Sequence, residues 1–86
     1  MYELNEPMDI GETISVVALF GLPYKIRPVR FKWNGRLFEV KEITYAWQTR
    51  EGQRKIYHFS VSDGKTLYEL SFNTDSLLWS LENLEA

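Results

Sequence analysis

Short runs of alternating apolar and polar residues, separated by regularly spaced turn signals, extend along most of this chain. The turn signals are Asn34-Gly35, Glu51-Gly52, Asp63-Gly64 and the polar stretch 73–76, and β-branched and aromatic residues flank each of them. Such spacing is typical of an antiparallel meander. The pattern predicts an all-β fold of six strands, over residues 13–20, 28–33, 36–49, 54–62, 66–72 and 77–81.

Pairing the strands through their turns predicts one strongly aromatic face. A two-residue loop at Asn34-Gly35 places aromatic residues opposite each other on that face and Arg30 opposite Glu39 on the reverse face. The residues expected to point inward together are Phe31, Phe38, Tyr45, Tyr57, Phe59, Tyr68, Phe72 and Trp79. Each large side chain stabilises the fold by roughly 1.5 to 3 kcal/mol when buried, so we expect most of them to form the core.

The remaining loops are assigned by keeping the aromatic residues on this face. A three-residue loop of residues 50–52 puts Gly52 at the left-handed position that ends a G1-bulge hairpin, so a positive φ is expected there. Two residues close the loop at 63–64, and four close the loop at 73–76. These loops bring together the pairs Tyr45 with Tyr57, Phe59 with Tyr68, His58 with Glu69, and Leu70 with Trp79.

The third expected strand contains an irregularity. Its apolar phase slips after Val40, so we expect a β-bulge near Lys41 and Glu42. A sheet with one aromatic face curls, and the bulge sharpens the bend, so the expected architecture is a six-stranded meander curled into a roll or partly open barrel. A helix over residues 77–84 is the alternative to the last strand.

Length and composition place further bounds on the protein. A chain of 86 residues forms one small domain, 1–86, whose first 12 residues we expect to be a loosely ordered arm. The absence of cysteine excludes disulfides and thiolate zinc sites and fits a cytoplasmic location. The longest apolar run, residues 14–24, is too short to cross a bilayer and is interrupted by Gly21 and Pro23, so we expect no membrane association.

Three segments, "RPVRFKWNGRLFEVKEITYAW", "IYHFSVSDGKTLYELSFN" and "LLWSLENL", resemble a small bacterial all-β domain family of unknown function. The resemblance runs from Arg27 to the end and rests on a W-x-G-R turn, a Trp that closes the next strand, a Y-x-x-x-x-x-D-G hairpin and a final W-x-L strand. Related domains lie at the tail of some proteins related to Y-family DNA polymerases. The resemblance implies no catalytic residue, and it implies a DNA-associated accessory role.

The side chains available for chemistry predict neither an enzyme nor a metal site. His58 is the only histidine, and no serine lies in a nucleophile-elbow motif. Its expected partner, Glu69, makes an ordinary cross-strand pair, and no two carboxylates are set apart for acid and base roles. One imidazole and scattered carboxylates do not form a zinc or calcium ligand set, so we expect no metal or cofactor.

Charge is unevenly distributed along the chain, although the net charge is only −2. Both ends are acidic, whereas bases concentrate in the middle segment 25–36, where Arg30 and Lys32 are expected to point away from the core. Trp33 or Trp47 could offer a ring for base stacking, although Trp33 could instead lie under Arg36 as a cation–π pair. The candidate contacts to nucleic acid or an acidic partner are Lys25, Arg27, Arg30, Lys32, Arg36, Arg54 and Lys55.

The first strand is the other candidate surface. Its apolar run does not strictly alternate, so we expect an unpaired edge that adds to a partner's sheet or forms a homodimer. The candidate edge residues are Ile14, Val16, Val17, Leu19 and Phe20. The sequence thus favours a non-catalytic protein-interaction or self-associating module, with a nucleic-acid-associated accessory domain that uses residues 25–36 as the alternative.

Overall fold

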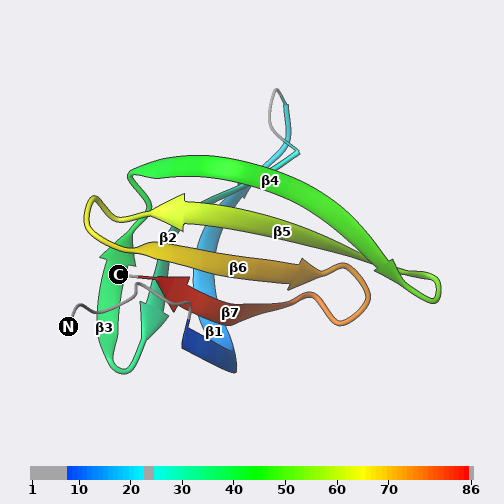
Figure 1. The fold of residues 1–86 in the computed structure, drawn as a ribbon. Coiled ribbons are helices and arrows are strands. Elements are labelled where there is room, and N and C mark those ends of the chain that lie inside the picture. The colour runs from blue at the N-terminus through cyan, green and yellow to red at the C-terminus, as the bar shows by residue number, and fades with distance from the viewer. Residues whose placement is uncertain (1–7, 23–24, 86) are drawn as a thin grey trace.

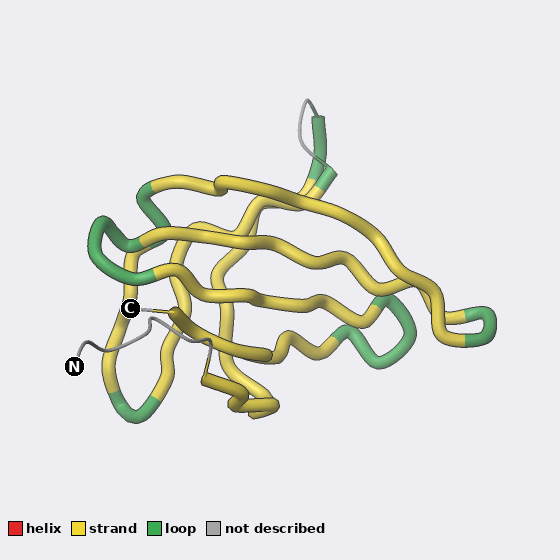
Figure 2. Tube along the Cα trace, in the orientation of Figure 1, coloured by secondary structure: helices red, strands yellow, loops and turns green. Residues whose placement is uncertain are grey.

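The computed structural model describes residues 8–22 and 25–85, which form strands and turns without a helix (Figures 1 and 2). The strands are β1 (Met8–Phe20), β2 (Ile26–Trp33), β3 (Arg36–Glu39), β4 (Glu42–Glu51), β5 (Arg54–Ser62), β6 (Leu67–Asn73) and β7 (Leu78–Glu85). They form one antiparallel sheet in the order β3-β2-β1-β7-β6-β5-β4. The all-β prediction is confirmed, and the last element is a strand. Within those two ranges no helix is long and apolar enough to span a membrane.

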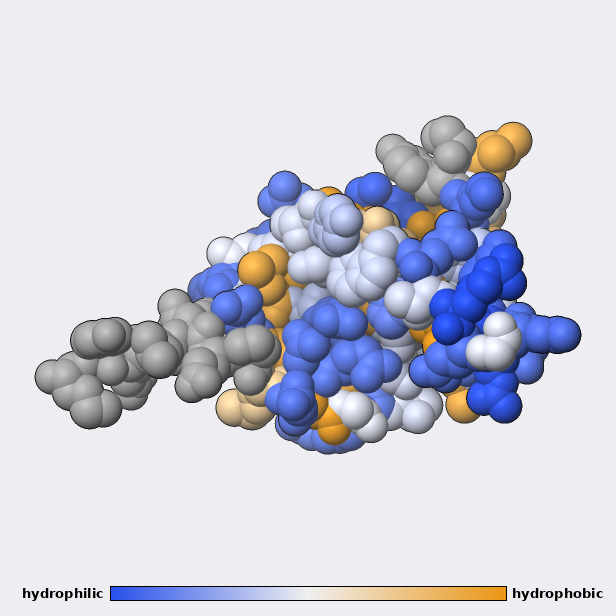
Figure 3. All heavy atoms as spheres, turned by 45° about the vertical axis from the view of Figure 1, so that its right-hand side comes forward, coloured by the Kyte–Doolittle hydropathy of each residue, from blue (hydrophilic) through white to orange (hydrophobic). Residues whose placement is uncertain are grey.

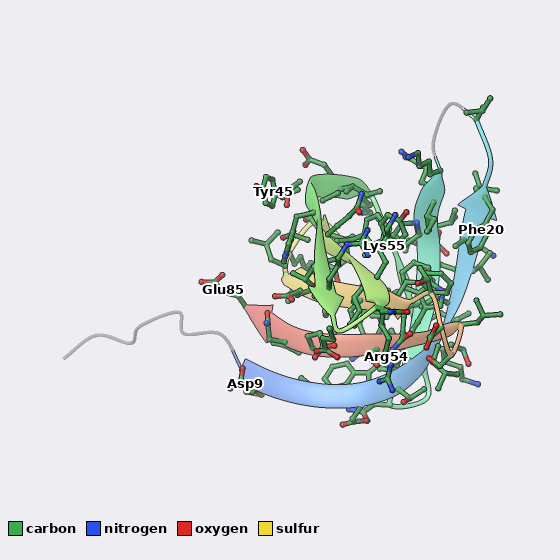
Figure 4. All side chains as sticks on the ribbon, turned by 90° about the vertical axis from the view of Figure 1, so that its right-hand side faces the viewer. Asp9, Phe20, Tyr45, Arg54, Lys55 and Glu85 are labelled. Atoms are coloured by element: carbon green, nitrogen blue, oxygen red, sulfur yellow. The ribbon has the colours of Figure 1, made fainter. Side chains whose placement is uncertain are left out.

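Two bends curl the sheet into an open roll (Figures 1 and 4). The first bend lies in β1: residues 8–14 of this strand pair with β7, and residues 15–20 pair with β2. The second bend lies between Val40 and Lys41. The N–H of Val40 donates to the carbonyl of Val29 in β2, whereas the N–H of the next residue, Lys41, donates to the carbonyl of Ser62 at the end of β5. The expected irregularity at residue 41 is therefore a strand break, which makes seven strands instead of six.

The predicted N-terminal arm is wrong for residues 8–12. These residues begin β1, and Met8, Asp9 and Glu12 pair with β7. Gly11 adopts a φ of 68° at the register shift between Asp9 and Glu12, a conformation that costs glycine little. Residues 1–7 of the predicted arm lie outside the described residues.

The core fills the inside of the roll. Phe31, Phe59, Tyr68, Phe72 and Trp79 are all buried, as the alternation of the strands predicts. Leucines and a valine complete the cluster, while two further expected members, Phe38 and Tyr57, pack against its margin. The first hairpin has the predicted register, with Phe31 opposite Phe38. The inward phase is thus correct for seven of the eight aromatic residues, Tyr45 being the exception.

The predicted β4–β5 register is wrong. Glu51 pairs with Arg54 across a two-residue turn, in which Gly52 has the predicted positive φ, 64°. A register shift between Ile43 and Tyr45 lets Ile43 point inward and turns Tyr45 to the outer face, where it is 65% exposed. Because of this bulge, Ile43 and Tyr45 lie on opposite faces of the sheet, although the apolar pattern places them on one face.

The β5–β6 register is displaced by two residues from the prediction. Ser62 pairs with Leu67 across a four-residue loop, so Phe59 faces Leu70 instead of Tyr68. The side chain of Asp63 shapes this loop, because its Oδ1 accepts hydrogen bonds from the N–H groups of Lys65 and Thr66, each 2.9 Å long. A displacement of two residues leaves the two faces unchanged, which is why the predicted core is still correct.

From Leu70 to Asn73 the β6–β7 register is also displaced by two residues, and a register shift between Glu69 and Leu70 adds one more, so that Tyr68 pairs with Leu84. Phe72 pairs with Trp79, and the four-residue loop spans residues 74–77 instead of 73–76. Asn73 Oδ1 accepts hydrogen bonds from the N–H groups of Asp75 and Ser76. Leu77 completes the loop with a φ of 63°, which the sequence pattern did not predict for a leucine.

We expect replacement of Asp63 to weaken the fold in a pH-dependent manner. Desolvation by burial raises the pKa of Asp63, but hydrogen bonds from Thr66, Lys65 and Tyr68 outweigh it, so the pKa is lowered overall. The stabilisation is therefore present above the unfolded-state pKa of about 3.9 and is lost as the pH falls through the folded-state pKa.

Asp63→Ala should lower the free energy of unfolding by about 1 to 3 kcal/mol at neutral pH. The Asp63→Asn variant keeps the Oδ1 acceptor but has no charge to titrate. In urea titrations, the advantage of wild type over Asp63→Asn should shrink as the pH falls below about 4. An advantage that does not change with pH would contradict this account.

Gly52→Val should destabilise the protein by about 1 to 3 kcal/mol, because a branched residue avoids a positive φ. No atom lies within 4 Å of the position that a Cβ at residue 52 would occupy, so the cost comes from the backbone and not from a clash. Urea unfolding of this variant beside Gln53→Val, in which the neighbouring turn residue lacks a positive φ, measures the difference. Equal stability of the two variants would show that the backbone conformation of Gly52 is unimportant.

Candidate functional site

Two bases occupy the outer face of the sheet where β1, β2 and β3 lie side by side. Arg30 and Lys32 alternate with the buried Phe31 and are exposed, as predicted. Their register neighbours are Val17 and Ser15 on β1, and Glu39 and Leu37 on β3. We call this surface the basic–apolar face and define it by Ser15, Val17, Arg30, Lys32, Leu37 and Glu39.

The basic–apolar face contains a shallow depression of about 180 Å³. Val17 and Leu37 are 52% and 68% exposed, so their side chains offer apolar surface beside the two bases. Arg30 Nε lies 3.3 Å from Glu39 Oε2, in a pair that is half-exposed on both sides. Exposed ion pairs contribute little to stability, and Arg30 can therefore exchange Glu39 for another carboxylate at small cost.

Of the remaining predicted contacts, Arg27 continues this outer face because it lies opposite the outward-facing Leu19, whereas Arg36, Arg54 and Lys55 have partners elsewhere. Arg36 lies opposite Trp33 in the register, and its Cζ is 5.5 Å from the centre of the Phe38 ring. Arg54 pairs with Asp75, and Lys55 lies over the Tyr57 ring. Arg27 is half-buried and faces Leu19 in the register, while Lys25 is exposed in the β1–β2 turn.

Neither tryptophan ring lies on the basic–apolar face. Trp33 lies among the core margin residues, and Trp47 stacks on His58 with ring centres 5.0 Å apart. Tyr45 adjoins Trp47 on the outer face of β4, away from Phe20 at the end of β1 (Figure 4). A stacking platform for single-stranded nucleic acid needs rings next to phosphate-binding bases, and neither tryptophan provides that combination.

A polar groove of about 450 Å³ lies on the outer face of the middle strands. Glu51, Glu69 and Glu82 line it, and no lysine or arginine of the described chain does. His58 Nδ1 lies 3.4 Å from Glu69 Oε2, although the two residues are diagonal neighbours and not directly opposite as predicted. The pair forms because a two-residue displacement leaves both side chains on the same face.

Side chains that line this groove form hydrogen bonds with one another or with residues next to the groove. Ser71 donates a hydrogen bond of 2.6 Å to Glu82, and Asn83 donates one of 2.9 Å to Glu69. His58 Nε2 lies 2.7 Å from the Thr49 hydroxyl. No group of three or more His, Cys, Asp or Glu residues that could hold a metal ion occurs in the described ranges.

The predicted interaction edge is not at the margin of the sheet. Strand β1 lies between β2 and β7, so Ile14 and Val16 point toward the core as half-buried residues. Val17 and Leu19 face outward, and Phe20 contacts Phe72 while remaining largely exposed. The true edges are β3 and β4. The sequence did not reveal this, because strand order depends on contacts between segments far apart in the chain.

The face shown in Figure 3 is mostly hydrophilic, with hydrophobic residues in separate small areas. The protein is thus a small open antiparallel β-roll that has a basic–apolar face and, separate from it, the polar groove lined by glutamates. Comparison of the chain with protein-family models, curated proteins and solved structures finds no match. Any function is therefore inferred from these surfaces and from the motifs of the sequence.

Proposed function

We propose that the protein is a non-catalytic interaction module whose basic–apolar face binds an acidic segment of a partner protein. The observation that carries the proposal is the alternation of Arg30 and Lys32 with exposed Val17 and Leu37 on one sheet face. Bases flanked by apolar surface fit a partner that presents carboxylates and apolar side chains together.

The proposal that the module is non-catalytic rests on the contacts of His58 and Ser71. His58 contacts Thr49 and Glu69, and Ser71 is buried while it donates to Glu82. A serine nucleophile needs an imidazole or similar base that takes up its proton, and the Ser71 hydroxyl donates to the Glu82 carboxylate instead of to His58. A protein partner is favoured over nucleic acid because Arg30 and Lys32 are interleaved with apolar residues, and because neither tryptophan ring lies on that face.

The experiment compares an Arg30→Ala/Lys32→Ala variant with wild type, using fluorescence anisotropy of labelled probes. The probes are a peptide in which Glu and Leu alternate, an all-Glu peptide, and single-stranded and duplex DNA. We expect the Glu-Leu peptide to bind wild type and to lose affinity by about 3- to 30-fold in the variant, from two exposed charge contacts of up to about 1 kcal/mol each. Added salt should weaken the wild-type interaction.

A matched control removes the same number of positive charges from outside the basic–apolar face. Lys41→Ala/Lys65→Ala removes two exposed bases outside this face and should bind the peptide as wild type does. Leu37→Ser should weaken binding of the Glu-Leu peptide more than binding of the all-Glu peptide. If wild type binds DNA but neither peptide, the nucleic-acid alternative replaces this proposal, and if no probe binds at low salt, both are rejected.

A further inference from the structure

We infer that β4 is a self-association edge, through which two copies pair antiparallel to form a continuous sheet. Strand β4 ends the sheet order, and the pairings of the described chain join it to β5 alone. It forms the upper margin of the sheet in Figure 1. An edge strand presents a row of backbone groups that another strand can bond, unless the sequence blocks it.

The two edges differ in how they are protected. Strand β3 has only four residues, and Arg36 and Glu39 at its ends are charged. Strand β4 has ten, and the stretch 43–49 contains neither a charged residue nor proline. Short length and charge are the usual means of preventing edge pairing, and β4 lacks both over its middle part. Its main irregularity is the register shift between Ile43 and Tyr45, which limits the regular stretch to residues 45–51.

The direction of the backbone groups follows from the turn. A two-residue hairpin closes on a hydrogen-bonded pair, here Glu51 with Arg54, and such pairs alternate along an antiparallel ladder. Residues 45, 47, 49 and 51 therefore bond to β5. The outward N–H and C=O groups belong to Ala46, Gln48 and Arg50.

A second copy is the occupant that these positions fit. An antiparallel register centred on Gln48 pairs stretch 45–51 of one copy with the same stretch of the other. In it all three residues with outward backbone groups find a partner of the same kind, because Ala46 lies opposite Arg50 and Gln48 lies opposite Gln48. Centring on Arg50 would oppose two like charges. In the Gln48 register Tyr45 faces Glu51 of the second copy, so a phenol donor meets a carboxylate acceptor twice in one symmetric contact.

The outer face supports the same occupant. Tyr45 and Trp47 have ring centres 5.3 Å apart, and Trp47 stacks on His58, so apolar surface already lies beside this edge. The second copy would cover part of it, with Thr49 opposite Trp47. An acidic partner segment is disfavoured here because Glu42 and Glu51 flank the stretch. This surface is separate from the basic–apolar face.

The absence of cysteine permits a direct test by cross-linking. A single Gln48→Cys substitution places its two thiols at a hydrogen-bonded pair, where Cα atoms lie about 5.5 Å apart, within the range for a disulfide. Ala46→Cys is the matched control, on the same face and strand. In this register the two cysteines at position 46, one in each copy, are four residues or roughly 14 Å apart along the strand.

We expect Gln48→Cys to form a disulfide-linked dimer under mild oxidation at least about tenfold faster than Ala46→Cys, because pairing holds its thiols together. Equal rates in the two variants, or no cross-linking of Gln48→Cys, would overturn the proposal. Full-length protein is used throughout, and urea unfolding verifies that each variant is folded.

Sedimentation of the cysteine-free protein provides a second measurement. Wild type and Gln48→Ala should associate as the concentration rises, whereas Gln48→Lys, which opposes two ammonium groups, should remain monomeric. A monomeric wild type at all concentrations would also overturn the inference. Gln48→Lys should still bind the Glu-Leu peptide, so failure of the dimer and failure of the proposed partner site are distinguishable.

Discussion

Aromatic packing across the inside of the roll is the interaction on which the rest of the structure depends. The Phe31 ring of β2 meets the Tyr68 ring of β6 edge to face, with centres 5.1 Å apart, and Phe38 of β3 lies 5.5 Å from Tyr68. Neither β2 nor β3 is a neighbour of β6 in the sheet, so these contacts hold the β2–β3 hairpin against the middle of the sheet over the core. Because Phe31 points inward, Arg30 and Lys32 on either side of it must point outward.

The same packing is linked to the loop that sets the β5–β6 register. Tyr68 donates its hydroxyl to Asp63 Oδ2 at 3.0 Å, while Asp63 Oδ1 accepts two backbone N–H groups. Burial and this hydrogen bond raise the pKa of Tyr68, which keeps the phenol neutral inside the core. A buried ring, a turn and a strand register thus support one another through one carboxylate.

The outer surface of the roll divides into regions with different chemistry. Bases and apolar side chains share the face of β1, β2 and β3, carboxylates line the groove of the middle strands, and exposed rings border the edge at β4. The charged side chains are thus unevenly distributed over the surface, although the net charge is only −2.

The sequence by itself determined the fold class, the inward phase of most aromatic residues, and the outward position of Arg30 and Lys32, because alternation along a strand is a local property. Errors of two residues at the loops left those results intact, whereas the single extra residue before Tyr45 reversed its face. Only the tertiary structure decided the strand order, and with it that β4 and not β1 is the long edge. That order depends on which distant segments pack over the core, and no local pattern encodes such contacts.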